Sequence, residues 1–316
     1  MKQKLLDVVI PIVGADIDTF KNSLPFIKRY LPVKNIILIG AYDVEEKVAD
    51  LKGVTYVNED ELVPGLNLPS IKKIKKYISG TERRSGWYFQ QFLKMGYARI
   101  CKDDYYLIWD ADTIPIKNVD FFDESGKPYL DYREYVKYDE CFFRTQDLLF
   151  PDKYLHKQLK DSFICEHLLV NVTIMNELLD DLAANGAAGN DTFFENVMYV
   201  IPKDIINLSG FSEFETYAAY VLKKHGDTHT LRYWRNLRNA GIYIGRNTTE
   251  ENLNWMSQMF DVISVEDFNP QWFICKVFLA LDKKHRIPFR IVYGVVQAMY
   301  KVIYDLRFKV RNILKK

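Results

Sequence analysis

The chain has 316 residues, 48% of them hydrophobic and 15% aromatic, so it can bury a sizeable core in one large domain or in one domain with an appendage. Its four cysteines show no CxxC spacing, which argues against a disulfide framework and for a reducing compartment. No run approaches the roughly 20 apolar residues of a membrane-spanning helix, and acid and proline follow the N-terminus too early for a signal peptide. We therefore expect a cytoplasmic protein.

The charge is unevenly distributed along the chain, although the formal net charge is only +1. Residues 283–316 hold ten Lys or Arg and one acid, Asp305, which leaves 33 basic and 41 acidic residues in the rest. Such asymmetry indicates an anionic surface as a partner, either a membrane or a nucleic acid.

Strand and helix patterns alternate over the first 110 residues. We expect strands at 7–13, 35–43, 54–60 and 105–109, and helices at 18–29, 71–78 and 83–101. This alternation predicts an α/β fold with a parallel sheet. Ligands of such sheets bind at the carboxyl ends of the strands, where all four segments carry polar or acidic residues.

Two further segments have clear patterns. Residues 162–186 fit a strand and then a helix closed by Gly186. Residues 210–226 fit a helix with Ser212 as its N-cap and Glu215 three positions later.

From Pro288 onward the pattern is that of one amphipathic helix. Apolar residues recur at alternating spacings of four and three, at Val292, Val296, Met299, Ile303, Leu306, Val310 and Ile313. The helix either packs on the globule or lies on an anionic membrane leaflet. No nucleic-acid-binding module accompanies the basic residues, so we expect no nucleic acid as partner. We place an α/β domain at 1–250 and a helical extension at 251–316.

Asp110 and Asp112 directly follow the apolar segment 105–109, although Asp is a poor strand residue and is costly to bury unpaired. Two carboxylates at a strand end can converge on Mg²⁺ or Mn²⁺, which keeps phosphates in its remaining positions. Thr113 would orient one carboxylate. The alternative is an acidic surface turn with Pro115 as its turn residue.

At these residues the sequence resembles the GT-A-fold glycosyltransferases that carry a DxD motif. Four blocks (83–101, 105–116, 162–171 and 210–221) are similar, in that order, to a family of bacterial nucleotide-diphospho-sugar transferases from polysaccharide gene clusters. The resemblance implies a GT-A-like, mostly parallel sheet flanked by helices. It also implies metal-dependent transfer of a sugar from a nucleotide-sugar donor to a surface-polysaccharide or lipid-linked glycan acceptor, at the inner face of the cytoplasmic membrane.

The resemblance assigns donor contacts residue by residue. Asp110 and Asp112 would hold Mn²⁺ or Mg²⁺ against the donor diphosphate, where the metal neutralises charge on the leaving group. Pro11, Val13 and Asp16 would contact the nucleoside, unless Asp16 is an ordinary loop acid. The helix before the motif strand offers further donor contacts, unless it presents a solvated face: Arg84, Gln90, Gln91 and Lys94.

Glu213 and Glu215 resemble the late acidic motif of these enzymes, in which a carboxylate at a helix N-terminus takes the acceptor proton as general base. We favour Glu213, because Glu215 is also the capping-box partner of Ser212. His229 is a candidate third metal ligand; zinc held by His225 and His229 is disfavoured, because no helix is expected through Gly226.

His167, Arg232 and Arg235 are candidate acceptor or phosphate contacts. The alternatives are a core histidine for the first, and a basic exposed helix at 231–238 for the two arginines.

Two other functions compete with glycosyl transfer. A sugar nucleotidyltransferase of related fold is disfavoured, because the loop at 13–20 lacks the Gly-rich, Arg/Lys-containing sequence that such enzymes usually carry. A non-catalytic glycan-binding protein would not need the acidic motifs. The signatures GxGxxG, GxxxxGK[ST] and GxSxG are absent from the sequence.

Overall fold

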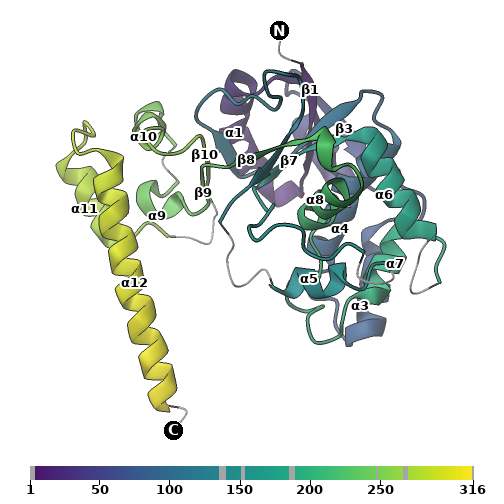
Figure 1. Ribbon diagram of the computed structural model, residues 1–316. Coiled ribbons are helices and arrows are strands. Elements are labelled where there is room, and N and C mark those ends of the chain that lie inside the picture. The colour runs from purple at the N-terminus through teal and green to yellow at the C-terminus, as the bar shows by residue number, and fades with distance from the viewer. Residues whose placement is uncertain are drawn as a thin grey trace. The chain divides into compact units, whose positions relative to one another are not determined.

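The computed structural model describes residues 4–134, 140–150, 154–184, 189–246, 248–265 and 270–314, without the side chains of 140 and 303–314 (Figure 1). The chain forms two compact units. Unit 1 holds Met1–Ala111 and Val119–Trp234, and unit 2 holds Asp112–Asn118 and Arg235–Lys316. The division thus falls after residue 234, ahead of the boundary that we expected at 250, and a short segment after the motif strand joins unit 2.

A five-stranded sheet forms the centre of unit 1, in the order β3-β2-β1-β4-β7. Its strands are β1 (Leu6–Pro11), β2 (Val33–Gly40), β3 (Val54–Asn58), β4 (Tyr105–Trp109) and β7 (His167–Asn171). The first four run parallel, and β7 runs antiparallel to β4. The predicted α/β class with a mostly parallel sheet is therefore confirmed.

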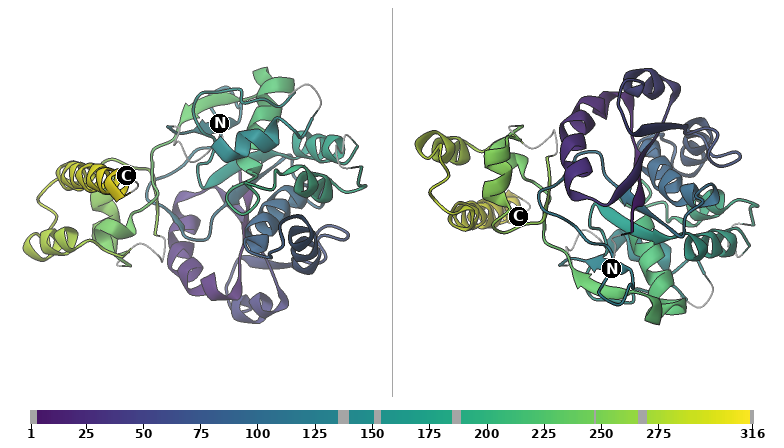
Figure 2. Two further views of the ribbon diagram at one scale, coloured as in Figure 1. Left: turned by 90° about the horizontal axis from the view of Figure 1, so that it is seen from below. Right: turned by 90° about the horizontal axis from the view of Figure 1, so that it is seen from above.

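Helices cover both faces of this sheet, with α1 (Ile17–Tyr30) on one face and α4 (Ser85–Gly96) on the other (Figure 2). Successive strand side chains point to opposite faces, so alternate residues such as Val9, Ile37 and Ile108 join the core on the α4 side. The connections also contain α2 (Tyr42–Val48) and α3 (Leu68–Ser79). The strands and helices predicted over the first 110 residues are all present.

The second half of unit 1 adds two strands and four helices among its described residues. These are β6 (Tyr129–Tyr132), α5 (Glu140–Gln146), α6 (Val172–Ala184), α7 (Phe193–Val200), α8 (Glu213–Lys224) and β8 (Thr230–Tyr233). The strand and helix predicted at 162–186 are confirmed as β7 and α6, while Gly186 lies outside the described residues. Ser212 caps α8 as predicted, because its Oγ accepts the Glu215 N–H at 3.3 Å.

The structure contradicts the exposed helix that we considered for residues 231–238. The segment forms β8, which pairs in parallel with β6, and the short strand β9 (Asn236–Leu237). Side chains alternate along β8, so Leu231 and Tyr233 are exposed while Arg232 is only partly exposed. Pairing with a distant strand outweighs any local helical preference here.

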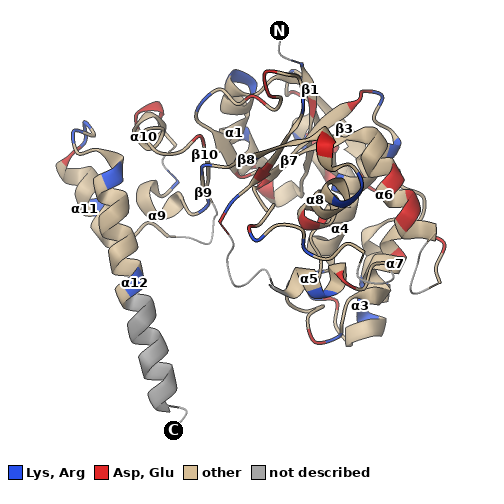
Figure 3. Cartoon of the chain, in the orientation of Figure 1, with Lys and Arg blue, Asp and Glu red and all other residues tan. Residues whose placement is uncertain are grey.

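Unit 2 contains a three-stranded sheet in the order β5-β10-β9, with β5 (Thr113–Pro115) and β10 (Val262–Ser264) antiparallel. Its helices are α9 (Gly241–Ile244), α10 (Glu250–Met256), α11 (Phe273–Leu281) and α12 (Phe289–Leu314). Figure 3 marks the basic residues on the described part of α12.

The amphipathic helix predicted after Pro288 is confirmed as α12, and its first apolar residues pack within the protein. Val292 and Val296 are buried, whereas Met299 is 38% exposed. The side chains of the later apolar residues of this helix, from Ile303 onward, lie outside the part that the structure describes. In the part of the chain that the structure describes, no helix is both long and apolar enough to cross a bilayer.

Candidate functional site

Asp110 lies at the exit of β4, a strand paired on both sides within the sheet. Tyr106 to Trp109 are fully buried, whereas the Asp110 side chain is 32% exposed. Its N–H donates to the Glu166 carbonyl at 3.1 Å. Glu166 has a φ of 60°, which is uncommon for a residue other than glycine and indicates a backbone held in place by its surroundings. The strand exit is therefore a fixed position for a carboxylate.

A buried lysine from α4 joins Asp110 to a second carboxylate. Lys94 Nζ donates to Asp110 Oδ1 at 2.8 Å and to Glu213 Oε1 at 3.0 Å, and its side chain is 5% exposed. Side chains on a helix point toward its N-terminus, so a lysine near the end of α4 can reach the carboxyl edge of the sheet. One ammonium and two carboxylates leave a net negative charge beside Asp110.

The pKa values of this cluster follow from burial and from the three charges. Burial alone would lower the pKa of Lys94, but Asp110 and Glu213 outweigh burial and raise it, so the ammonium stays charged. Burial raises the pKa of Glu213, and Lys94 opposes this increase. The cluster is thus an internally paired group in which the more exposed carboxylate is Asp110.

Gln91 fixes the start of α8 against α4. Its Oε1 accepts the Glu213 N–H at 3.1 Å and its Nε2 donates to the Trp87 carbonyl at 3.0 Å. Gln91 is buried, so neither it nor Lys94 lies on the solvated helix face that we considered. Four of the predicted site residues, Gln91, Lys94, Asp110 and Glu213, therefore meet at one place.

Asp112 belongs to unit 2. Its carbonyl accepts the Val265 N–H at 3.1 Å, and its Oδ1 accepts the Thr113 hydroxyl at 3.3 Å. Thr113 also lies 3.0 Å from Ser264 Oγ. Thr113 therefore contacts one carboxylate of the pair, and its orienting role stays a prediction.

The oxygen ligands of Asp110 and Asp112 suit a hard divalent ion. Carboxylate oxygens are the ligands that Mg²⁺ and Mn²⁺ prefer, and metal binding by these two residues stays a prediction. Within the described ranges, no group of three or more His, Cys, Asp or Glu side chains is arranged to hold a metal.

His229 is buried next to α8. Its Nδ1 lies 2.8 Å from Thr228 Oγ1, and among the described residues its Nε2 has no hydrogen-bond partner. Burial, and to a lesser extent the charge of His225, lowers its pKa to about 4, so the ring is neutral near pH 7. A neutral ring can ligate a metal. The role expected for His229 stays a prediction.

The exits of β1 to β3 carry the other residues expected at the donor side. Pro11 ends β1, and Val13 and Asp16 follow it, with Val13 59% exposed. The sequence reasoning missed Glu59, which follows β3. Burial, followed by the charges of Asp60 and Asp43, raises the pKa of Glu59 to about 7. A carboxyl group that titrates near neutral pH at this sheet edge is a candidate for ligand binding.

Glu215 is buried and accepts hydrogen bonds from the chain before β7. Its Oε1 accepts the Ser162 hydroxyl at 2.7 Å and the Phe163 N–H at 2.9 Å. These contacts give the second acid of the predicted pair a structural role.

His167 and Arg232 meet at a buried carboxylate, Asp131. His167 Nε2 lies 2.8 Å from Asp131 Oδ2, and Arg232 binds both carboxylate oxygens, at 2.6 and 2.7 Å. Burial would raise the pKa of Asp131, but Arg232 and His167 lower it on balance. His167 is 1% exposed, which matches the core-histidine alternative. These ion pairs account for His167 and Arg232 without any ligand.

The remaining predicted residues are dispersed. Arg235 pairs with Asp261 inside unit 2, with Nη2 2.7 Å from Oδ1. Gln90 is half-buried on α4. Arg84 precedes α4, far along the helix from Lys94, and its guanidinium stacks 4.3 Å from the centre of the Trp87 ring.

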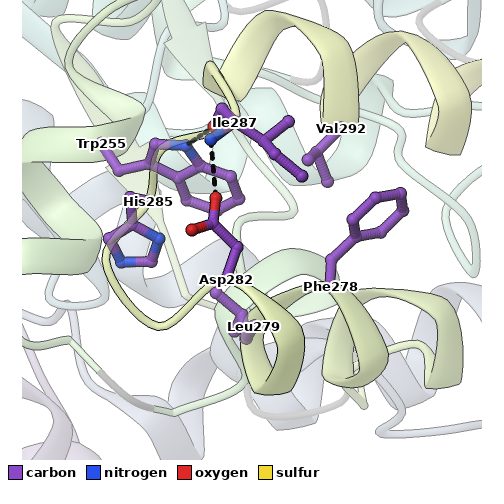
Figure 4. Close-up of a pocket in the computed structure, with 7 residues that line it drawn as sticks. All are labelled: Trp255, Phe278, Leu279, Asp282, His285, Ile287 and Val292. Atoms are coloured by element: carbon purple, nitrogen blue, oxygen red, sulfur yellow. Dashed lines mark hydrogen bonds between the residues drawn. The ribbon is translucent and has the colours of Figure 1, made fainter.

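Unit 2 contains a small pocket whose walls are held by structural contacts (Figure 4). Asp282 Oδ2 accepts the Ile287 N–H at 2.6 Å, and Trp255 Nε1 donates to the Ile287 carbonyl at 2.8 Å. The Trp255 and His285 rings stack at 4.6 Å. The Trp255 N–H and the Asp282 carboxylate of this pocket thus bind the loop between α11 and α12.

Solved structures similar to this chain include three glycosyltransferases. Mouse xyloside xylosyltransferase 1 is 11% identical over 84% of this chain and 99% of its own, with a TM-score of 0.45. The galactosyltransferase LgtC is 11% identical over 87% of this chain and 95% of its own, with a TM-score of 0.42. GlyE of Streptococcus pneumoniae is 11% identical over 94% of this chain and 64% of its own, with a TM-score of 0.42.

The search of curated proteins gives no match. The family described as "Family of unknown function (DUF6492)" matches residues 34–269. The match spans most of the chain, and the protein is therefore a member of this family.

Proposed function

We propose that the protein is a metal-dependent glycosyltransferase that uses a nucleotide-sugar donor. The observation that carries the proposal is the buried Lys94, which ties the carboxylate at the exit of β4 to the first residue of α8. The carboxyl edge of a parallel sheet is where ligands of such folds bind. The four sequence blocks that resemble GT-A glycosyltransferases include all three of the elements that meet there.

Asp110 and Asp112 would hold Mn²⁺ or Mg²⁺ against the donor diphosphate. When bound, the ion supplies positive charge to the leaving nucleoside diphosphate. Lys94 keeps Asp110 oriented by a charge-assisted hydrogen bond, and the Thr113 hydroxyl does the same for Asp112. In the transfer, the bond from the anomeric carbon to the phosphate oxygen breaks, and a bond to the acceptor hydroxyl oxygen forms.

Glu213 has two possible tasks in this scheme. As general base it would take the acceptor proton, and burial raises its pKa above the usual value of a carboxyl group, which strengthens its hold on a proton. Its 3% exposure and its contact with Lys94 also fit a positioning residue that holds Asp110 through the lysine. Glu213→Gln distinguishes the two tasks: loss of a base lowers kcat at every metal concentration, whereas loss of positioning raises the Mn²⁺ concentration needed for half-maximal rate.

Thermal stabilisation by a panel of nucleotide-sugars, with and without Mn²⁺, tests the proposal directly. A donor at 100 times its Kd should stabilise the protein by about 2.7 kcal/mol, and only when the metal is present. Asp112→Asn should abolish the metal-dependent part. If no nucleotide-sugar raises Tm in the presence of Mn²⁺, the proposal is wrong.

Product analysis separates this function from its two rivals. Incubation of the best donor with candidate acceptors should release a nucleoside diphosphate. A nucleotidyltransferase would instead make a nucleotide-sugar from a nucleoside triphosphate and a sugar phosphate. A glycan-binding protein would bind the acceptor without any turnover, and Asp112→Asn would leave that binding unchanged.

We further propose that unit 2 attaches the enzyme to an anionic membrane, where a lipid-linked or surface-polysaccharide acceptor would be met. The proposal is supported by the basic residues after 283 and by apolar side chains on α11: Phe273 is 80% exposed and Leu281 is 77% exposed. Flotation with phosphatidylglycerol vesicles should recover the wild-type protein but less of Phe273→Ser/Leu281→Ser. Leu148→Ser, at a 49% exposed site in unit 1, is the matched control. Equal recovery of all three proteins would contradict membrane attachment.

A further inference from the structure

The segment 67–84 concentrates positive charge at the junction of α3 and α4. It contains six basic residues and one acid, Glu82: the basic residues are Lys72, Lys73, Lys75, Lys76, Arg83 and Arg84. Lys76 lies 3.5 Å from Glu82, and both side chains are largely exposed. Glu82 can neutralise one positive charge, so the segment keeps a net charge of about +5.

Lys75 is the unusual member of this group, because it is fully buried. Its Nζ donates to Ser79 Oγ at 2.9 Å and to Asn207 Oδ1. Both partners are neutral, and within the described part of the chain no carboxylate pairs with this ammonium. Burial lowers the pKa of Lys75, and the charges of Arg83 and Arg84 lower it further. A buried cation without a counter-charge is costly unless an anion approaches it.

Arg84 presents a second cation at the same place. Its backbone has a φ of 66°, a strained conformation for arginine at the residue that precedes α4. The stacking on Trp87 fixes the plane of the guanidinium, while Nε is buried and has no hydrogen-bond partner among the described residues. Nη2 lies 3.5 Å from Ser209 Oγ. Burial lowers the pKa of Arg84, and Arg83 adds to this effect.

The loop 206–210 connects these two cations. Asn207 accepts from Lys75 and Ser209 contacts Arg84, while the Tyr88 hydroxyl holds the loop to α4 by donating to the Ile206 carbonyl at 2.9 Å. The N-terminus of α4 adds its helix dipole. A Cβ atom at Gly86 would have no atom within 4 Å apart from its chain neighbours and the adjacent backbone of the helix. The first turn of α4 is therefore open at Gly86, which follows the two arginines by two and three positions in the chain.

We propose that Arg83, Arg84 and the start of α4 form a binding site for a phosphate group, with Lys75 beneath it as a fixed positive charge. Planar guanidinium groups bind phosphate through paired hydrogen bonds, and Arg83 is exposed and able to reach a ligand. The phosphate comes either from a soluble diphosphate or from a lipid headgroup. The site does not use the Asp110 and Asp112 carboxylates and needs no divalent metal.

Calorimetric titration of the full-length protein with pyrophosphate, in EDTA and low salt, tests the site. Chelation of divalent ions keeps pyrophosphate from binding through a metal at Asp110 and Asp112, so the result is independent of the proposed glycosyl transfer. We expect Arg84→Gln to raise the Kd about tenfold and Arg83→Gln several-fold, as typical of lost charged hydrogen bonds. Lys52→Gln, which removes one exposed charge elsewhere in unit 1, should change the Kd less than about twofold.

Circular dichroism and thermal melting check that the variants fold, and the exposed Arg83→Gln keeps the test valid if Arg84→Gln does not. Absence of pyrophosphate binding, or equal Kd values for all variants, overturns the proposal. Competition identifies the source of the phosphate. Displacement of pyrophosphate by UDP assigns the site to a soluble diphosphate, and displacement by phosphatidylglycerol vesicles assigns it to a lipid headgroup.

Discussion

Two buried lysines in unit 1 have opposite surroundings. Lys94, between α4, β4 and α8, donates to two carboxylates, and these raise its pKa. Lys75, on α3, donates to a hydroxyl and an amide, and its pKa is lowered. The same side chain at similar exposure is therefore electrostatically satisfied inside the protein in one region and unsatisfied in the other. Lys94 thus holds two carboxylates of the candidate site in place. Lys75 has only neutral partners, and we propose that an anionic ligand supplies its counter-charge.

The largest effect should come from removal of the paired lysine. Lys94→Met leaves Glu213 buried without a counter-charge, so we expect the free energy of unfolding to fall by about 3–5 kcal/mol. Urea denaturation measures this loss. The double variant Lys94→Met/Glu213→Met should recover part of it, because no buried charge is left unpaired. Equal losses in the single and double variants would mean that packing, and not charge, dominates at Lys94.

A smaller effect should follow when only the charge of Glu213 is removed. Glu213→Gln keeps the shape of the side chain but weakens its bond with Lys94, and we expect a loss of about 1–3 kcal/mol in unfolding free energy. Glu215→Gln is the matched control, because its Oε1 can still accept from Ser162 and Phe163. Equal losses of unfolding free energy in the two variants, measured by urea denaturation, would contradict the expected difference between Glu213 and Glu215.

The unpaired lysine should behave differently. Lys75→Met replaces an uncompensated buried cation by an apolar chain of similar length, so unfolding free energy should change by no more than about 1 kcal/mol in either direction. The same variant should lose much of the stabilisation that pyrophosphate gives to the wild type in thermal melting. A loss comparable to that of Lys94→Met would show that Lys75 is satisfied by its neutral partners.

The smallest effect concerns Glu59 and depends on pH. Its pKa is raised from 4.5 to about 7 in the folded protein, so the folded state holds a proton that the unfolded state has already released. Stability should therefore decrease as pH rises from about 4.5 to about 7 and then level off. Glu59→Gln should remove this decrease, giving a Tm advantage over the wild type of about 2 °C at pH 8 and less at pH 5. Parallel Tm profiles of the two proteins would contradict the assignment.

The sequence predicted the parts of the molecule that depend on local pattern. The alternation of strands and helices, the cap at Ser212 and the position of Asp110 at a strand exit all rest on neighbouring residues, and the structure agrees with them. It could not predict which acids Lys94 would meet, because these lie 16 and 119 positions away in the chain.

The errors have the same origin. The run at 231–238 suggested a helix by its spacing of arginines, but pairing with β6 makes it a strand. Lys75 lies in the helix predicted at 71–78, but the helix pattern could not show that its side chain would be buried and would bind Asn207, which is distant in the chain. Glu59 could not be singled out from the sequence, because its pKa is raised mainly by burial, then by its neighbour Asp60 and by Asp43 on α2.

The chain leaves unit 1 after Ala111, contributes β5 to the sheet of unit 2, and returns at Val119 before it leaves again after Trp234. Expression of residues 1–234 alone would therefore leave β5 without its partner β10, as an unpaired edge in the middle of the remaining chain. Such a fragment should aggregate or be cut by proteases near 112–118. The two compact units cannot be separated by a single cut in the chain. Any attempt to isolate unit 1 must either splice out residues 112–118 or retain the C-terminal region.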